Sequence, residues 1–278
     1  MGLPLAMRGR TPVRSVFRQS LLSYRISLSV VSASLFGISV VLVATFDAFG
    51  GVEGMEGLLA LLPESIRAML KAQGGFATEA TGYIGMQYRH PFYLLSTSGF
   101  VIAMSAGAVA REIERSTALM LLAVPLARWR YLAAKVASMV VVIVVLLVAV
   151  WAGTGAGVAV TGLGGVDMLT LARVLVNLLA LALAIGGIAT LLSSLSSDGG
   201  HVISVAAGVA AAMFFGDFLA TIWSPAELVG YVSLFHYYDP LGVTQSGLAV
   251  GDMAVLMGVA VAGFGGALVA FQRRDIAA

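Results

Sequence analysis

The stretch VASMVVVIVVLLVAVWAGTGAGVAV, residues 136–160, contains no charged side chain. A transmembrane α-helix needs about 20 consecutive, mostly apolar residues to cross the hydrocarbon core of a bilayer. Residues 136–160 meet this requirement along their whole length. The stretch therefore predicts a helix that spans a membrane, and the rest of the chain must be compatible with that environment.

Five other stretches are of similar length and equally apolar. They are Ile26–Phe46, Phe92–Ala110, Leu169–Leu192, Val202–Trp223 and Ala249–Phe271. Of the 278 residues, 59% are hydrophobic and 11% are charged, whereas soluble domains are about 45–50% apolar and about 25% charged. We therefore expect an all-α polytopic membrane protein with about six transmembrane helices. A single domain would cover residues 1–278, with the six-span bundle at 26–271 and a tail at 272–278.

The distribution of Lys and Arg predicts the orientation, because cytoplasmic flanks carry the excess of positive charge. With the N-terminus in the cytoplasm, 12 of the 16 basic residues lie inside and the remaining 4 lie outside. The outer four are Arg67, Lys71, Arg89 and Arg173. The opposite orientation would reverse this bias. Six spans then place both termini in the cytoplasm.

A segment before the first span has the pattern of a surface helix. Thr11 suits a helix N-cap and Pro12 suits the first helical position. Phe17 falls on an apolar face, while Arg14 and Arg18 fall on another. This pattern predicts an N-terminal amphipathic helix over residues 11–25, which lies on the inner membrane surface and then bends into the first span.

The long outer segment, residues 47–89, also predicts a helix. Pro63 and Glu64 are typical of a first helical turn. Ile66 and Met69 follow at helical spacing, with Lys71 on the polar side. We expect a short interfacial helix outside the membrane.

The inner segment between the second and third spans reads REIERSTALMLLAVPLARWRYLAAK, residues 111–135. Charged residues cluster at its two ends, and an apolar run, residues 118–124, occupies its middle. Pro125 disfavours helix at the residue before it. The segment therefore predicts a short cytoplasmic helix, a break, and a new helix that enters the third span.

Catalytic signatures are missing from the sequence. The P-loop pattern GxxxxGK[ST] does not occur around Lys71 or Lys135, the two lysines. There is no HExxH, no cysteine, and no pair of the three histidines at metal-ligand spacing. Basic residues are not interleaved with aromatics over a domain, so the sequence argues against nucleic-acid binding. We expect a non-catalytic chain that holds no metal or other cofactor of its own.

A few polar residues fall within or at the edge of the predicted spans. Asp217 lies in the fifth span, and Arg173 shares a helical face with Asn177 near the outer end of the fourth. Ionisable groups inside a membrane are costly and often functional. They predict either a polar lining of a translocation path or a structural pair, and an Arg173–Asp217 pair is compatible with their similar depth.

The inner segment resembles the signature of the permeases of type-2 ABC exporters. That signature is E-x-E-x-x-[ST], a leucine-rich turn, a Pro, an Arg and a Lys before the next span. The matching residues are Glu112, Glu114, Thr117, Leu121, Leu122, Pro125, Arg128, Tyr131 and Lys135. Ser116 departs from the glycine usual in the family. The C-terminal run 271–276 and the outer run 224–248, which resembles a re-entrant region, support the likeness.

The resemblance implies the transmembrane subunit of an ATP-binding cassette transporter. Two permease copies or paralogues would pair in the bilayer, and separate ATPase subunits, which bind ATP and magnesium, would dock beneath them. The residues that the resemblance assigns to ATPase coupling are Glu112, Glu114, Thr117, Leu121, Leu122, Pro125 and Arg128. Arg14, Phe17 and Arg18 of the surface helix would also contact the ATPase. Abundant Ala, Gly and Val indicate a bacterial source, so we expect the cytoplasmic (inner) membrane.

Two other classes of protein remain open on the sequence alone. An ATP-independent secondary carrier would often show paired interruptions in mid-membrane helices. A membrane-embedded enzyme would need catalytic motifs, and Ser105 lacks the leading glycine of GxSxG. The substrate is not indicated by any motif.

Overall fold

The computed structural model describes residues 12–64, 66, 79–114 and 127–274, and every regular element within these ranges is helical. The chain is therefore an all-α protein, as predicted. The α-helices are α1 (Pro12–Ala48), α2 (Gly51–Ala60), α4 (Ala80–Gln87), α5 (Pro91–Ala106), α6 (Ala110–Glu114), α8 (Arg128–Thr161), α9 (Met168–Leu195), α10 (Gly199–Ile222), α11 (Glu227–Val232), α12 (Pro240–Ser246) and α13 (Val250–Arg273). Two short 3₁₀ turns are η2 (Ser224–Ala226) and η3 (Leu234–Tyr237).

Five helices in the described residues are long and apolar enough to cross a membrane: α1, α8, α9, α10 and α13. They confirm five of the six predicted spans, and the chain is a multi-pass membrane protein. The predicted second span, Phe92–Ala110, differs. It corresponds to α5, whose 16 residues give a length of about 24 Å, less than the ~30 Å hydrocarbon core.

The second span is short because the chain breaks on both sides of α5. Pro91 starts α5, and His90 Nδ1 accepts a hydrogen bond from the Phe92 amide at 3.3 Å. The preceding helix α4 ends at Gln87, so Tyr88 to His90 form a junction between two helices. At the other end, Gly107 closes α5. The sequence predicted neither α4 nor the junction.

The first helix is longer than a span. Its 37 residues correspond to about 56 Å, well beyond the ~30 Å of hydrocarbon. Residues 12–25, predicted as a separate surface helix, continue into the first span without interruption in α1. The excess length places several turns outside the hydrocarbon when the helix stands upright.

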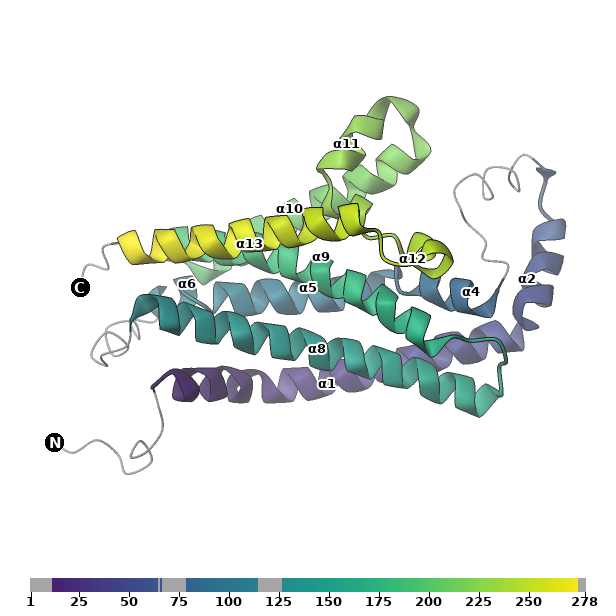
Figure 1. Cartoon of the computed structure of the whole chain (residues 1–278), viewed down its shortest axis with the longest axis horizontal. Helices are drawn as coiled ribbons and strands as arrows, with labels where there is room; N and C mark the ends of the chain where they lie inside the picture. Colours follow the sequence, from purple (N-terminus) through teal and green to yellow (C-terminus); the bar gives the residue numbers. More distant parts are fainter. Residues whose placement is uncertain (1–11, 65, 67–78, 115–126, 275–278) are drawn as a thin grey trace.

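The long helices lie alongside one another and form a bundle, with the start of α1, α6, the start of α8 and the end of α13 at one end (Figure 1). We call this the inner end, and the opposite end, with α2, α4 and α12, the outer end. At the centre is α9, of whose 28 residues 16 are buried. The helix α13 packs along one side of α9, and α1 packs along α8.

Glycines allow the closest helix approaches. A Cβ on Gly153 would lie 2.8 Å from Phe36 Cα, at the crossing of α8 and α1. A Cβ on Gly263 would lie 2.7 Å from the Gly187 carbonyl oxygen, at the crossing of α13 and α9. Small residues are favoured between membrane helices because they let backbones approach. These mid-span glycines therefore serve helix packing.

The outer segments contain short helices. The predicted interfacial helix starting at Pro63 falls largely on residues outside those described, while α2 lies before it. Residues 224–248 fold into η2, α11, η3 and α12. The α11 region projects sideways from the bundle (Figure 1).

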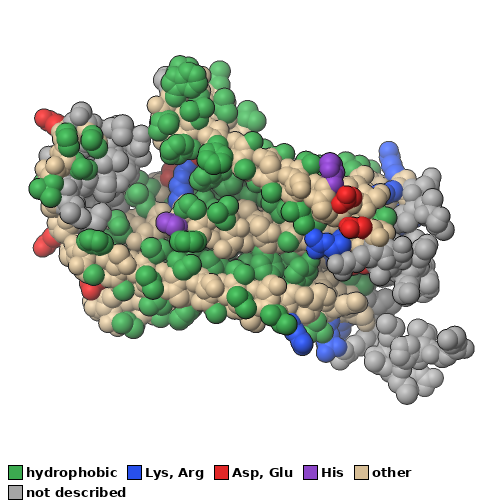
Figure 2. All heavy atoms as spheres, turned by 180° about the vertical axis from the view of Figure 1, so that it is seen from behind, with side chains coloured by type: hydrophobic (Ala, Val, Ile, Leu, Met, Phe, Trp, Pro, Cys, Tyr) green, Lys and Arg blue, Asp and Glu red, His purple; other side chains and the backbone are tan. Residues whose placement is uncertain are grey.

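The surface of the bundle suits lipid. On the face seen in Figure 2, hydrophobic side chains spread over the middle, and the charged side chains gather mainly toward the ends. Large apolar side chains such as Val148, Val261 and Ile26 are exposed on the long helices. Exposed apolar surface of this extent is compatible with a hydrocarbon environment and not with water.

Candidate functional site

The inner end holds the described part of the predicted coupling signature. The chain leaves α5 at Gly107, where a Cβ would lie 2.8 Å from the Tyr24 hydroxyl of α1. That hydroxyl donates to the Ala103 carbonyl at 3.4 Å. A side chain at position 107 would therefore displace the Tyr24 hydroxyl, so the glycine lies where α1 and the end of α5 approach closely. The turn then leads directly into α6.

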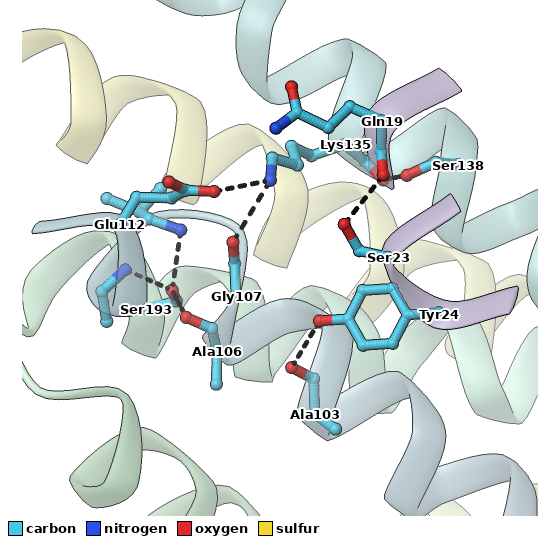
Figure 3. Close-up of polar contacts among 12 residues, drawn as sticks. Gln19, Ser23, Tyr24, Ala103, Ala106, Gly107, Glu112, Lys135, Ser138 and Ser193 are labelled. Carbon is cyan, nitrogen blue, oxygen red and sulfur yellow. Dashed lines mark hydrogen bonds and ion pairs between the residues drawn. The ribbon is translucent and has the colours of Figure 1, made fainter. Parts of the chain in front are cut away.

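A serine from the central helix positions α6. The Ser193 hydroxyl of α9 accepts from the Val109 amide at 3.3 Å and from the Ala110 amide at 3.1 Å, and it donates to the Ala106 carbonyl at 3.4 Å. The first amides of a helix have no partner within the helix. Ser193 satisfies two donors at the start of α6 and so fixes this helix against α9 (Figure 3).

An ion pair ties α6 to α8. Lys135 Nζ lies 3.0 Å from Glu112 Oε1, and it also donates to the Gly107 carbonyl at 3.4 Å (Figure 3). Both side chains are partly buried, with 17% of Lys135 and 28% of Glu112 exposed. Burial reduces solvent screening, so this pair is stronger than one on an open surface.

The second carboxylate of the signature reaches a different helix. Glu114 Oε2 accepts a hydrogen bond from the Gly199 amide, the first residue of α10, at 3.0 Å. A negative group is stabilised at the positive end of a helix dipole. Asp198, the N-cap of α10, accepts from the His201 amide at 3.0 Å. This bond and that from Gly200 hold the pKa of Asp198 below its ordinary value.

Two arginines bind the carbonyl ends of the neighbouring helices. Arg128, at the start of α8, donates to the carbonyls of Phe271, Gln272 and Arg274 at 3.1, 3.3 and 2.6 Å. Arg274 in turn donates to the carbonyls of Ser194 and Ser196, which close α9, at 3.1 and 2.7 Å. Cations are favoured at helix C-termini. The arginines therefore link α8 to α13 and α13 to α9.

Glu112, Glu114 and Arg128 all lie at the inner end of the bundle, and their role in ATPase coupling stays a prediction. Their charged groups contact other helices of the same chain, a role that the sequence did not indicate. Sequence reasoning also missed the contributions of Ser193 and Arg274. The predicted coupling residues Thr117, Leu121, Leu122 and Pro125 lie outside the described residues.

The predicted contact residues of the N-terminal helix lie at the same end. Arg14 and Arg18 are exposed and Phe17 is half-buried. Val16 packs against a buried group that includes Val109, Tyr131 and Phe271. The first turns of α1 therefore belong to the inner end of the bundle.

The predicted translocation-path residues do not form the Arg173–Asp217 pair that their similar depth allowed. Arg89, at the α4–α5 junction, lies 2.5 Å from Asp217, and His236 Nδ1 lies 3.7 Å from the other oxygen of Asp217. No ion pair joins Asp217 to Arg173 within the part of the chain that the structure describes. Arg173 is exposed, and Asp217 is buried with 6% of its side chain accessible.

The other two residues of that prediction have separate environments. Asn177 is buried and donates to the Tyr237 carbonyl at 3.2 Å. Arg173 lies near Asp167, the N-cap of α9. A hydrogen bond from Thr170, together with the Leu169 amide and the charge of Arg173, lowers the pKa of Asp167 below its ordinary value. The three predicted residues therefore do not form one cluster.

A buried polar network extends from the outer pair into the bundle. Arg89 donates to the Tyr238 carbonyl at 3.2 Å, and the Tyr238 hydroxyl donates to the Tyr88 carbonyl at 3.1 Å. The Tyr88 hydroxyl lies 3.0 Å from Thr154 Oγ1 of α8. Within the described ranges, no three His, Asp or Glu residues are grouped so that they could hold a metal ion. The polar groups of this network therefore hold the α4–α5 junction, the segment after η3 and α8 in position relative to one another.

The described residues form a bundle of apolar helices, with polar contacts at the inner end and an ion pair to the buried Asp217 toward the outer end. The family described as ABC-2 family transporter protein matches residues 26–276. This chain therefore belongs to the ABC-2 transporter family, which confirms the resemblance drawn from residues 112–135. No curated protein and no solved structure matches the chain significantly.

Proposed function

We propose that this chain is the permease subunit of an ATP-driven exporter, and that a separate ATPase subunit docks at its inner end. Membership of the ABC-2 family supports a transport component of the membrane, and the sequence contains no P-loop that would bind ATP. The observation that carries the proposal is the inner-end arrangement. Glu112, Glu114 and Arg128 flank residues 115–126 and reach three different helices.

This arrangement suits the transmission of a movement. A subunit that displaces residues 115–126 would pull on α8 through Glu112 and on α10 through Glu114. It would also pull on α13 through Arg128. Binding of ATP can shift such an equilibrium only when one arrangement of the complex binds ATP more tightly than the other. The apolar run 118–124 supplies the side chains that a partner groove would cover.

The proposal also includes a second permease copy or paralogue and a bacterial cytoplasmic membrane. With the inner end in the cytoplasm, 12 basic residues flank the cytoplasmic side against 4 outside. A pair of permeases would provide a route between two bundles. The ATPase would bind ATP and magnesium and would contain the hydrolytic machinery.

Photo-crosslinking tests the docking surface. A photoreactive amino acid replaces Leu121 in the full chain, expressed in its native membrane, and the same group replaces Leu228 as a control. Leu228 is 78% exposed on α11, away from the inner end. We expect an adduct from position 121 that contains a protein labelled by azido-ATP, and none from position 228. Adducts of 121 with lipid alone would refute the docking assignment.

A further inference from the structure

The inner half of α1 carries positive charge and no acidic residue. Arg14, Arg18 and Arg25 are exposed, and the first acidic residue of the chain is Asp47. Within the part of the chain that the structure describes, none of these three arginines takes part in an ion pair. The neighbouring helix α8 contains no Asp or Glu. An anionic group that approaches the inner half of α1 therefore meets no competing carboxylate of α1 or α8.

Two of these arginines share one face of α1 with apolar residues. Arg18 and Arg25 are two helical turns apart, which is about 10 Å along the axis and about 20° around it. Leu22, Ile26 and Val30 follow Arg18 at successive four-residue spacing, and their exposed fractions are 45%, 72% and 59%. The helix packs along α8 and lies at the edge of the bundle (Figure 1). This exposed face is therefore basic at its inner part and apolar further into the membrane.

The length of α1 places this face at the inner edge of the bilayer. Measured along the helix from its end at Ala48, Arg25 lies about 35 Å away and Arg18 about 45 Å. The hydrocarbon core is about 30 Å thick, and the headgroup layer adds about 5–8 Å on each side. With Ala48 at the outer edge of the hydrocarbon, Arg25 lies at the depth of the inner lipid phosphates. Arg18 lies on their water side, within reach through its long side chain.

We propose that Arg18, Leu22, Arg25 and Ile26 form a binding face for an anionic phospholipid of the inner leaflet, such as phosphatidylglycerol. The guanidinium groups of Arg18 and Arg25 donate hydrogen bonds to the phosphate oxygens, a geometry that suits arginine. Leu22 and Ile26 pack against the upper part of an acyl chain. This contact needs no ATPase, so the inference is independent of the proposed function.

An anionic phospholipid fits this face better than a soluble protein or a zwitterionic lipid does. A soluble protein could cover Arg18 but could not follow the face past Arg25 into the hydrocarbon, where Ile26 and Val30 are exposed. Phosphatidylcholine has the same phosphate together with a positive choline group, which the arginines repel. The net negative charge therefore selects the lipid, and each arginine near an anionic surface contributes about a fivefold preference.

Fluorescence quenching by labelled lipids tests the proposal in the full chain, reconstituted without any ATPase in nanodiscs of phosphatidylcholine and phosphatidylglycerol in equal amounts. The sequence contains no cysteine, so a bimane fluorophore attaches only where cysteine is introduced. Ser29→Cys places it one turn beyond Arg25, at an exposed position. Ser204→Cys is the matched position on α10, a helix without Lys or Arg. Each sample receives a trace of phosphatidylglycerol or phosphatidylcholine with a nitroxide on its acyl chain.

At position 29 we expect phosphatidylglycerol to quench more strongly than phosphatidylcholine, and at position 204 we expect the two lipids to quench equally. Arg18→Gln and Arg25→Gln should each lower the preference at position 29 about fivefold. Arg25→Lys keeps the charge and should retain most of it. Raising the salt concentration to about 1 M shortens the Debye length to about 3 Å, so the preference of the chain with both arginines should fall as well.

The control variant is Arg273→Gln, which removes an exposed inner-end charge from α13 and should leave the preference at position 29 unchanged. An equal loss in Arg273→Gln and Arg25→Gln would mean general surface charge and would overturn the binding face. Equal quenching by the two lipids at position 29 would overturn it too, and loss of a co-purifying ATPase in Arg25→Gln would then assign the arginines to a protein partner. The salt dependence still tests the proposal if an arginine variant does not fold.

Discussion

The crossing of α9 and α13 provides a test of the packing of the bundle. A Cβ added to Gly263 would lie 2.7 Å from the Gly187 carbonyl oxygen and 2.8 Å from its Cα. The Gly187 carbonyl carbon would lie closer still. Ordinary contact begins at 3.4 Å, so the helices must separate by more than 3.4 − 2.7 = 0.7 Å. Both partners are backbone and cannot rotate away. Gly263→Ala therefore forces a shift of the two helix backbones.

The expected magnitude follows from a matched control in the same helix. Gly265 is exposed and has nothing within 4 Å of an added Cβ. Gly265→Ala should be neutral or stabilising by up to about 1 kcal/mol, because alanine favours helix. Gly263→Ala gains the same propensity but overpacks the crossing, which costs about 1–3 kcal/mol. The difference between the two variants isolates that cost.

The assay is unfolding of each purified variant in mixed detergent micelles as the fraction of sodium dodecyl sulfate rises, followed by circular dichroism. We expect Gly263→Ala to unfold at a lower fraction than Gly265→Ala, with a difference in free energy of unfolding of about 1–3 kcal/mol. Equal midpoints for the two variants would refute the close backbone approach of α9 and α13.

Three other predictions concern orientation and the inner end. Glu53→Cys should react with a membrane-impermeant maleimide in intact cells, and Arg14→Cys only after permeabilisation; the reverse pattern would invert the topology. Arg274→Ala should lower the free energy of unfolding by about 1 kcal/mol through its lost carbonyl contacts, whereas the exposed Arg273→Ala should not, and equal loss would contradict the link to α9. The folded pKa of Asp198 is lowered, so its contribution to stability is present above the unfolded pKa and lost as pH falls through the folded one. Titration from about pH 5 to about pH 3 should thus destabilise the unchanged chain more than Asp198→Asn, and parallel curves would contradict the cap.

The long spans could be predicted because each is a local property of the sequence. An uncharged apolar run such as residues 136–160 is sufficient to define α8 in the membrane. The short helix α4 has no such signal. It contains Gly82 and Gly85, and Gly85 faces Thr244 so closely that a Cβ would lie 2.6 Å from Thr244 Cγ2. Tertiary packing against α12 and α9, which no local pattern reveals, forms this helix.

The candidate sites could be predicted only in part for the same reason. The spacing of Glu112, Glu114 and Arg128 identified a family signature, but their partners lie far along the chain. Glu114 contacts a residue 85 positions away, and Arg89 and Asp217 are separated by 128 positions. The predicted depth of Asp217 in the membrane indicated that it would need a basic partner near the outer end. Depth alone could not show whether that partner was Arg173 or Arg89. The turn before Pro91 decides this choice, because it points Arg89 toward α10.

The central claim is that this permease works with an ATPase subunit. The most direct measurement is purification of the tagged chain from its native membrane in mild detergent, followed by an assay of ATP hydrolysis in the purified material. The account predicts a co-purifying subunit and hydrolysis that vanadate inhibits. A folded, monodisperse chain that repeatedly purifies alone, without hydrolysis, would contradict it.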